Sequence, residues 1–251
     1  MNLKTQIKEF GKQTLKKVHN LSTKLLVSRF DHGFLHDDIP LSTDTYHTDF
    51  LIKHGNLQGK RVLEVGSREV TGKSAARKNF DKAEYIGFDF YAGDNVDVVG
   101  DAHKLSTYFD EKFDVIYSSA VFEHLAMPWI ASFEIAKCLK VGGIVCITTH
   151  FSYSSHERPW HFFQFSDMAL KVLFPPESGI ECIEAGVSNS IVGRFSSRVE
   201  DAELAYQNVT GLYCHSTFLG RKIKETPDAF DWKNLNLQDV VGDTLYPKPK
   251  F

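Results

Sequence analysis

The chain has 251 residues, of which 42% are hydrophobic and 24% are charged, and its formal net charge is −3. This length allows one large domain with a core, and the composition is that of a globular protein. The slight negative charge excludes a basic body that binds nucleic acid, so we expect no nucleic-acid partner.

The first thirty residues are predicted to form a basic amphipathic helix. Seven of them are lysine or arginine and one is acidic. The apolar residues recur in steps of three and four, at Leu3, Ile7, Phe10, Val18, Leu21 and Leu25. A helix lying on the domain explains this pattern, and so does weak contact with a membrane surface or a partner helix. We assign residues 1–45 to this leader and a polar connector, and expect no secretory signal.

Residues 46–223 carry alternating helix and strand patterns. Helices are expected at Thr43–Asn56, Ser74–Phe80 and Trp129–Leu139. Strands are expected at Arg61–Gly66, Tyr85–Asp89, Val96–Asp101, Phe113–Ser118, Gly143–Thr149, Ile180–Val187 and Leu212–Leu219. This alternation predicts an α/β, Rossmann-like fold, with a mainly parallel seven-stranded sheet and helices on both faces. We expect no helix of the usual length between the last two strands, and an irregular tail over residues 224–251.

The end of the first strand predicts a ligand site. Glu64 lies near the carboxyl end of this strand, and Gly66, Ser67 and Arg68 follow it. Glycine allows a sharp turn and lets a ligand approach the backbone closely. In a doubly wound sheet the ligand binds beyond the carboxyl ends of the strands, where the strand order reverses. A carboxylate at Glu64 would attract a cationic group there and repel a phosphate.

Acidic residues also end the next two strands. Asp89, followed by Phe90, comes about twenty residues after the glycine turn, where an acid accepts both hydroxyls of a ribose. Asp101 is placed to bind the exocyclic amine of an adenine, with the amide of Ala102 facing the ring and His103 next in the chain. These residues predict a nucleoside cofactor.

Five segments resemble, in order and spacing, the motifs of class I methyltransferases that use S-adenosyl-L-methionine (SAM), particularly the type 11 group. They are Leu63–Gly72, Tyr85–Asp89, Asp101–His103, Phe113–Leu125 and Leu139–Gly143. The resemblance implies a class I methyltransferase fold, SAM as cofactor and methyl transfer as the reaction. It extends from Lys60 to Phe151 and departs from the family where Arg68 replaces the second glycine of the loop. The implied cofactor-binding residues are Glu64, Gly66, Ser67, Arg68, Asp89, Phe90, Asp101, Ala102, His103, Ser118 and Ser119.

Candidate residues for the acceptor side follow the fourth and fifth strands. Methyl transfer is an in-line displacement that needs alignment and the exclusion of water. His124 and His150 are the candidate catalytic bases, because histidine titrates near neutral pH; alternatively, His124 only hydrogen-bonds the loop backbone. The segment His156–Phe163 is predicted to close over the acceptor as a lid. The expected acceptor-binding residues are Glu123, Tyr153, His156, Arg158, Trp160 and His161.

The leading interpretation is methyl transfer to an oxygen or nitrogen of a small polar acceptor, such as a sugar, a nucleotide-sugar or a surface-glycan precursor. The first alternative, an NAD(P)-dependent oxidoreductase, would need a fuller glycine-rich turn, and Glu64 would repel its pyrophosphate. The second is a non-catalytic binding module on the same fold. The acceptor and the oligomeric state stay open.

The wide spacing of the cysteines gives no zinc pattern, and no carboxylate–histidine spacing is diagnostic of a metal site, so no metal is expected. Cys138, Cys146, Cys182 and Cys214 form no C-x-x-C pair. This pattern predicts reduced thiols in a cytoplasmic protein.

Overall fold

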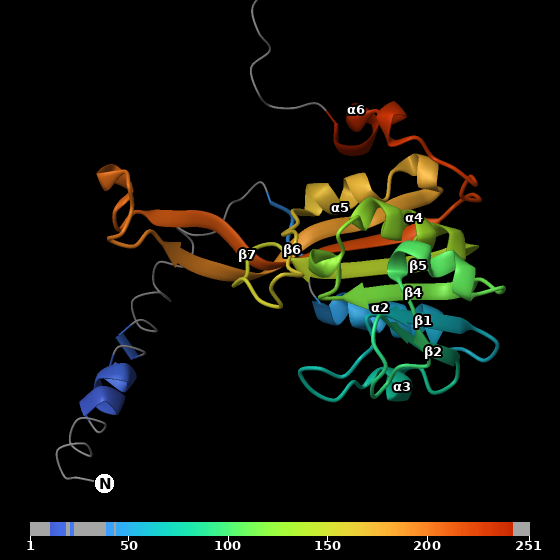
Figure 1. Ribbon diagram of the computed structural model, residues 1–251, viewed down its shortest axis with the longest axis horizontal. Coiled ribbons are helices and arrows are strands. Elements are labelled where there is room, and N and C mark those ends of the chain that lie inside the picture. Colours follow the sequence, from blue (N-terminus) through green and yellow to red (C-terminus); the bar gives the residue numbers. More distant parts are fainter. Residues whose placement is uncertain (1–10, 19–20, 23–38, 43, 243–251) are drawn as a thin grey trace, which may run out of the picture. The chain divides into compact units, whose positions relative to one another are not determined.

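The computed structural model describes residues 11–18, 21–22, 39–42 and 44–242 (Figure 1). The chain divides into two compact units, Ile39–Asn189 with Tyr213–Phe251, and Met1–Asp38 with Ser190–Leu212. Residues 11–18 and 21–22 of the predicted leader are helical, and Val18 and Leu21 are exposed. The rest of the predicted leader helix lies outside the described residues. Within the described parts of the chain, no helix has the length and apolar character needed to cross a bilayer.

The larger unit is built on a seven-stranded sheet with the order β3-β2-β1-β4-β5-β7-β6. The strands are β1 (Arg61–Val65), β2 (Glu84–Asp89), β3 (Val98–Val99), β4 (Phe113–Ser119), β5 (Leu139–His150), β6 (Ile180–Arg194) and β7 (Asn208–Lys222). The pairs from β3 through β5 are parallel, and β7 runs antiparallel to β5. The predicted mainly parallel sheet is therefore confirmed.

Helices follow most of these strands. The α-helices are α2 (Asp44–Gly55), α3 (Ala76–Asn79), α4 (Pro128–Cys138), α5 (Asp167–Leu173) and α6 (Leu237–Val241). The 3₁₀ helices are η2 (Ala102–Tyr108), η3 (Phe122–His124), η4 (Pro176–Ser178), η5 (Ala202–Leu204) and η6 (Trp232–Asn234). Between β6 and β7 the described chain has only the short turn η5, as expected.

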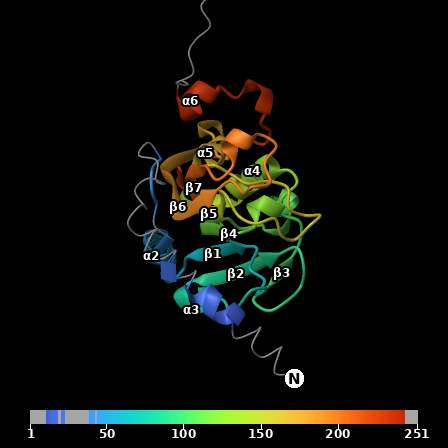
Figure 2. The same cartoon turned by 90° about the vertical axis from the view of Figure 1, so that its left-hand side faces the viewer.

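Both faces of the sheet are buried, and strand periodicity divides their side chains between two cores. Leu63, Ile116 and Val145 face one core, which contains residues of α4, α5 and η2. Val62 and Val115 face the other, which contains Leu51 of α2 and Phe80 after α3. In both views α4 and α5 lie apart from α2 and α3 (Figure 1, Figure 2). The prediction of helices on both faces is confirmed.

Several predicted bounds were wrong. The helix expected at Ser74–Phe80 shrinks to α3, because the amide of Ser74 donates to Glu69 and that of Ala76 to the Ser74 hydroxyl, which makes a turn first. The third strand is reduced to Val98–Val99. The tail is not wholly irregular, since it contains η6 and α6, whose N-caps Asp231 and Asn236 accept backbone N–H groups.

The smaller unit includes the parts of β6 and β7 that the sequence did not predict. The expected strands ended at Val187 and began at Leu212, whereas β6 continues to Arg194 and β7 starts at Asn208. Within residues 190–212, the N–H of Phe195 donates to Gln207 over 3.0 Å. The side chains of this stretch are mostly exposed and mixed in character, so the period-two pattern is weak.

The strand order reverses around β1, which lies between β2 and β4. Gly66 turns the chain away from the end of β1 with a φ of +87°, and a Cβ at this position would overlap Cγ2 of Val121. Only glycine meets both requirements. The turn, the end of β4 and the end of β2 therefore meet at one edge of the sheet, where a doubly wound fold binds its ligand.

Candidate functional site

Glu64 presents a partly buried carboxylate on the face of β1 that points toward α2. The hydroxyls of Tyr85 and Tyr117 both donate to its Oε2, the latter over 2.9 Å. Burial raises the pKa of Glu64 above its ordinary value, although the two tyrosine hydrogen bonds act in the opposite direction. Neither tyrosine was predicted as a site residue, because each comes from a neighbouring strand.

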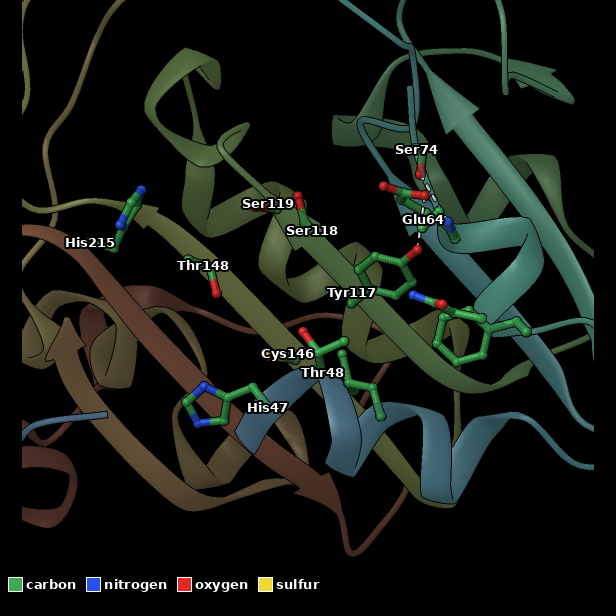
Figure 3. Close-up of a pocket in the computed structure, with 15 residues that line it drawn as sticks. His47, Thr48, Glu64, Ser74, Tyr117, Ser118, Ser119, Cys146, Thr148 and His215 are labelled. Carbon is green, nitrogen blue, oxygen red and sulfur yellow. Dashed lines mark hydrogen bonds between the residues drawn. The ribbon is translucent and has the colours of Figure 1, made fainter. Parts of the chain in front are cut away.

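A cavity of about 320 Å³ lies beside Glu64 at the carboxyl ends of the strands (Figure 3). Its polar lining includes Glu64, Ser74, Tyr117, Ser118, Ser119, Thr148, His47 and His215. Ser118 and Ser119 were predicted as site residues, and the others except Glu64 were missed. His47 comes from α2 and His215 from β7, far from the recognised motifs in the sequence.

Arg68 and Asp89 meet beyond the glycine turn. The backbone N–H of Arg68 donates to Oδ2 of Asp89 over 3.2 Å, and its Nε lies 3.4 Å from Oδ1. The guanidinium also lies over the ring of Tyr91, with its carbon 5.4 Å from the ring centroid. The arginine in the glycine position thus makes a defined contact with the predicted ribose-binding acid.

Ser67 and Ser118 each carry a buried hydroxyl with no hydrogen-bond partner among the described residues. Both residues lie at the switch point, one after β1 and the other in β4. Buried hydroxyls are normally satisfied, so such a pair is suited to hydrogen bonding with a bound molecule. The sequence predicted both as cofactor-binding residues.

Asp101 caps η2 in the structure. Its Oδ1 accepts the N–H of His103 over 2.9 Å and lies 2.6 Å from Nδ1 of the same histidine. Burial acts to raise the pKa of Asp101, but the hydrogen bonds from His103 outweigh it and lower the pKa below its ordinary value. Ala102 is buried beside it. The carboxylate keeps acceptor capacity for an adenine amine, and its role with adenine stays a prediction.

Glu123 is fully buried at the start of the loop after β4. Its Oε2 accepts the Thr149 hydroxyl over 2.6 Å, and its Oε1 lies 2.8 Å from Nδ1 of His150. Burial acts to raise the pKa of Glu123, yet the close contact with His150 and the hydrogen bond from Thr149 lower it below the ordinary value. The backbone carbonyl of Glu123 also accepts the N–H of Phe162 over 2.8 Å. Glu123 therefore holds both β5 and the lid segment.

The predicted lid, His156–Phe163, lies against the two candidate bases. Nδ1 of His124 is 2.8 Å from the carbonyl oxygen of Trp160. The ring of His156 lies edge-on to those of His124 and His150, at centroid distances of 4.9 and 5.2 Å. Nδ1 of His161 accepts a hydrogen bond from the backbone N–H of His156 over 3.1 Å. The histidines expected on the acceptor side are thus brought together.

Three other predicted residues surround this cluster. The ring of Tyr153 stacks on His150 at a centroid distance of 4.6 Å. The indole of Trp160 lies 6.3 Å from the ring of Phe90, which links the lid to the residue after Asp89. Arg158 is exposed. Whether each residue binds cofactor or acceptor stays a prediction.

Part of the chain matches a known protein family, and solved structures of similar proteins exist. Residues 57–147 match the type 11 family described as "Methyltransferase domain". A search of curated proteins found no match. Among solved structures, a SAM-dependent methyltransferase from Archaeoglobus fulgidus is similar, with 15% identity, a TM-score of 0.48, and 79% and 98% of the two chains covered. The YcgJ protein from Bacillus subtilis is similar with 16% identity, a TM-score of 0.47, and 72% and 99% covered.

Proposed function

We propose that this chain, whose residues 57–147 are the domain of a SAM-dependent methyltransferase, methylates a hydroxyl or amino group of a small polar acceptor. The acceptor class that we propose is a sugar, a nucleotide-sugar or a surface-glycan precursor. The oxidoreductase and the non-catalytic module are not retained, because the matched domain is that of a methyltransferase.

One observation carries the proposal: a polar and aromatic wall stands at the carboxyl ends of β4 and β5. His124, His150 and His156 offer hydrogen-bonding groups there, and half-exposed Tyr153 and Trp160 offer aromatic surface. Such rings combine an apolar face with a polar edge. A sugar has the same mixed character, because its ring carries apolar C–H faces and polar hydroxyls.

His124 is the better placed of the two candidate bases. A carbonyl oxygen accepts a hydrogen bond only from a nitrogen that carries a proton. The contact with the Trp160 carbonyl therefore places the proton of a neutral His124 ring on Nδ1. Nε2 then carries the lone pair that a base needs. His150 is only 7% exposed and has its Nδ1 against Glu123. We therefore propose His124 as the proton acceptor and His150 as a residue of the site wall.

When bound, SAM supplies an electrophilic methyl group on a sulfonium. Glu64, Asp89 and Asp101 would hold this cofactor, and its methyl group would pass to the acceptor oxygen or nitrogen while the sulfide product kept the electron pair of the carbon–sulfur bond. Nε2 of His124 takes the proton that the acceptor loses. Trp160 and Phe90 stand on the side of the lid, where they would exclude water from the reacting groups.

The test is a methyl-transfer screen with SAM over sugar, nucleotide-sugar and amine acceptors, followed by His124→Ala with the acceptor that is found. Loss of a general base typically lowers turnover by about 10²–10⁴-fold, so we expect a drop of that order with SAM binding retained. A drop of less than about threefold would remove His124 from catalysis. Transfer to none of these classes would overturn the proposed acceptor.

We also propose a cytosolic location. None of the four cysteines takes part in a disulfide, and Cys138 and Cys146 are buried. Free thiols persist in the reducing cytosol. Mass spectrometry of the protein alkylated directly in cell extract tests this, since a disulfide found there would contradict the proposal.

A further inference from the structure

Three potential metal ligands converge where β4, β5 and the lid segment meet. Glu123, His150 and His156 each offer a ligand atom, and these atoms all lie within 4.8 Å of one another. The closest pair is Oε1 of Glu123 and Nδ1 of His150, 2.8 Å apart. Ligands of a tetrahedral zinc ion, each about 2.1 Å from the metal, lie about 3.4 Å apart. Shifts of about an ångström would bring all three atoms to that spacing.

The groups behind these ligands hold them in a suitable orientation. Nδ1 of His156 lies 2.9 Å from the carbonyl oxygen of Ser154, so the N–H of a neutral ring is used there and the lone pair is on Nε2. Oε2 of Glu123 accepts the Thr149 hydroxyl over 2.6 Å, which leaves Oε1 toward the histidines. Histidines that bind metals almost always donate their second ring N–H to a carbonyl, carboxylate or water. His156 has this feature.

The charges at this place also favour a cation. Glu123 is fully buried, and Nε2 of His124, which carries a lone pair in the proposed tautomer, lies only 3.9 Å from its Oε1. A buried carboxylate is unfavourable unless a positive charge or a hydrogen-bond donor faces it, and a metal ion between Oε1 and the imidazole nitrogens would supply that charge. Magnesium and calcium prefer oxygen ligands alone, whereas two imidazoles and one carboxylate suit zinc and other first-row transition metals.

We propose that Glu123, His150 and His156 bind a divalent first-row transition-metal ion, for which Zn²⁺ is the probe. This site is not recognisable from the sequence, because its ligands are 27 and 6 residues apart and meet only through the pairing of β4 with β5. Three protein ligands leave at least one coordination position open, as in catalytic zinc sites.

The open position suggests a role in the reaction. A metal ion there would bind the oxygen or nitrogen of the acceptor and make its proton easier to lose, with Nε2 of His124 at the edge of the same site. This role rests on the proposed function, whereas metal binding by the three residues does not. The two parts are therefore tested separately.

The binding test uses the full chain, treated with a chelator and then titrated with Zn²⁺ by calorimetry, without SAM or acceptor. We expect one tightly bound ion per chain and at least tenfold weaker binding in His156→Gln. His54→Gln is the matched control, because Nδ1 of His54 also lies against a backbone carbonyl, that of Phe50, but outside the site. This control should bind Zn²⁺ like the wild type.

A second readout is the visible spectrum after Co²⁺ replaces Zn²⁺, which reports imidazole and carboxylate ligands directly. Glu123→Gln should change this spectrum, and the SAM affinity of the variant shows whether it folds. If Glu123→Gln does not fold, the spectrum of His156→Gln, which is a change in the half-buried lid, tests the site instead. Equal Zn²⁺ affinity in the wild type and His156→Gln would overturn the site and indicate that the cluster holds only a proton. If Zn²⁺ binds but leaves methyl transfer unchanged, the metal site stands and its role in the reaction is wrong.

Discussion

The Nε atom of Arg68 lies 3.4 Å from Oδ1 of Asp89, and the backbone N–H of Arg68 donates to Oδ2 of the same carboxylate. The residue that departs from the family's glycine-rich loop therefore contacts the predicted ribose-binding acid. The backbone N–H of Tyr91 also donates to Oδ1, over 3.0 Å, so each carboxylate oxygen accepts one backbone N–H. The second acceptor site of each oxygen can bind a ribose hydroxyl if the longer contact from Nε of Arg68 gives way.

Asp89→Ala is expected to weaken binding of SAM and of its demethylated product roughly tenfold to a hundredfold. Two hydroxyl hydrogen bonds to a charged acceptor would be lost, at a cost of about 1.5–3 kcal/mol. Calorimetric titration measures this, with Asp110→Ala as the matched control. Asp110 is an exposed acid that does not line the cavity, so the affinity of that variant should change by less than about threefold. Unchanged affinity in Asp89→Ala would remove Asp89 from the site.

Glu64→Gln is expected to weaken SAM about tenfold, because the carboxylate would attract the cationic amino-acid end of the cofactor. The comparison ligand is 5′-methylthioadenosine, which lacks that end and should bind the variant and the wild type alike. Equal losses for both ligands would place Glu64 away from the amino-acid end.

The same residue predicts a pH dependence. Burial raises the pKa of Glu64 above 4.5, so its carboxylate takes up a proton earlier than an exposed glutamate as the pH falls. SAM affinity of the wild type should therefore fall as the pH is lowered toward that raised pKa, and Glu64→Gln should lack this component. Parallel pH profiles for the two proteins would contradict the assignment.

Trp160→Ala is expected to raise the acceptor KM or lower kcat, with kcat/KM reduced at least about tenfold through poorer positioning. The indole lies 6.3 Å from the ring of Phe90, whereas its backbone carbonyl, which orients His124, is kept in the variant. Trp160→Phe should restore most of the activity. Steady-state kinetics with the acceptor from the screen measure this. Equal kinetic constants for the wild type, Trp160→Ala and Trp160→Phe would contradict a lid that faces the acceptor.

Lys222 predicts a stability effect far from the site. Its side chain is fully buried, and burial lowers its pKa from 10.5 to about 8. Nζ donates to the carbonyl of Ala136 and to the hydroxyl of Thr226. Because the folded-state pKa is below the unfolded one, the charge destabilises the native state fully below pH 8. This destabilisation is relieved as the pH rises from 8 to 10.5.

Any stability advantage of Lys222→Met over the wild type should therefore shrink with rising pH. Between pH 7 and pH 10 the difference in the free energy of unfolding should fall by about 1–3 kcal/mol. Urea unfolding of both proteins at the two pH values measures the change, and other titrating groups largely cancel in the difference. A constant difference would show that Lys222 keeps its ordinary pKa.

The sequence predicted the features that depend on neighbouring residues. The apolar runs at β1, β2 and β4 give the strands, and Glu64, Asp89 and Asp101 are recognisable because each acid stands at or near the end of an apolar strand. The extended ends of β6 and β7 escaped prediction, because mostly exposed strands have no clear apolar alternation. The membrane-surface contact of the leader stays a prediction.

The rest of the site depends on which strands are neighbours. Tyr85 and Tyr117 reach Glu64 because β2 and β4 flank β1, and the sequence around each tyrosine has no sign of this. His47 and His215 line the cavity from α2 and β7 in the same way. Long-range pairing, which a single sequence does not display, decides these contacts.

Calorimetric titration of the full chain with SAM and, separately, with NADH tests the central claim most directly. SAM and its demethylated product should each bind at one site, at concentrations on the order of micromolar, and NADH should give no heat of binding. Glu64 explains the expected difference, since it attracts the cationic end of SAM and repels a pyrophosphate. Binding of NADH without binding of SAM would contradict the assignment of this chain as a SAM-dependent methyltransferase.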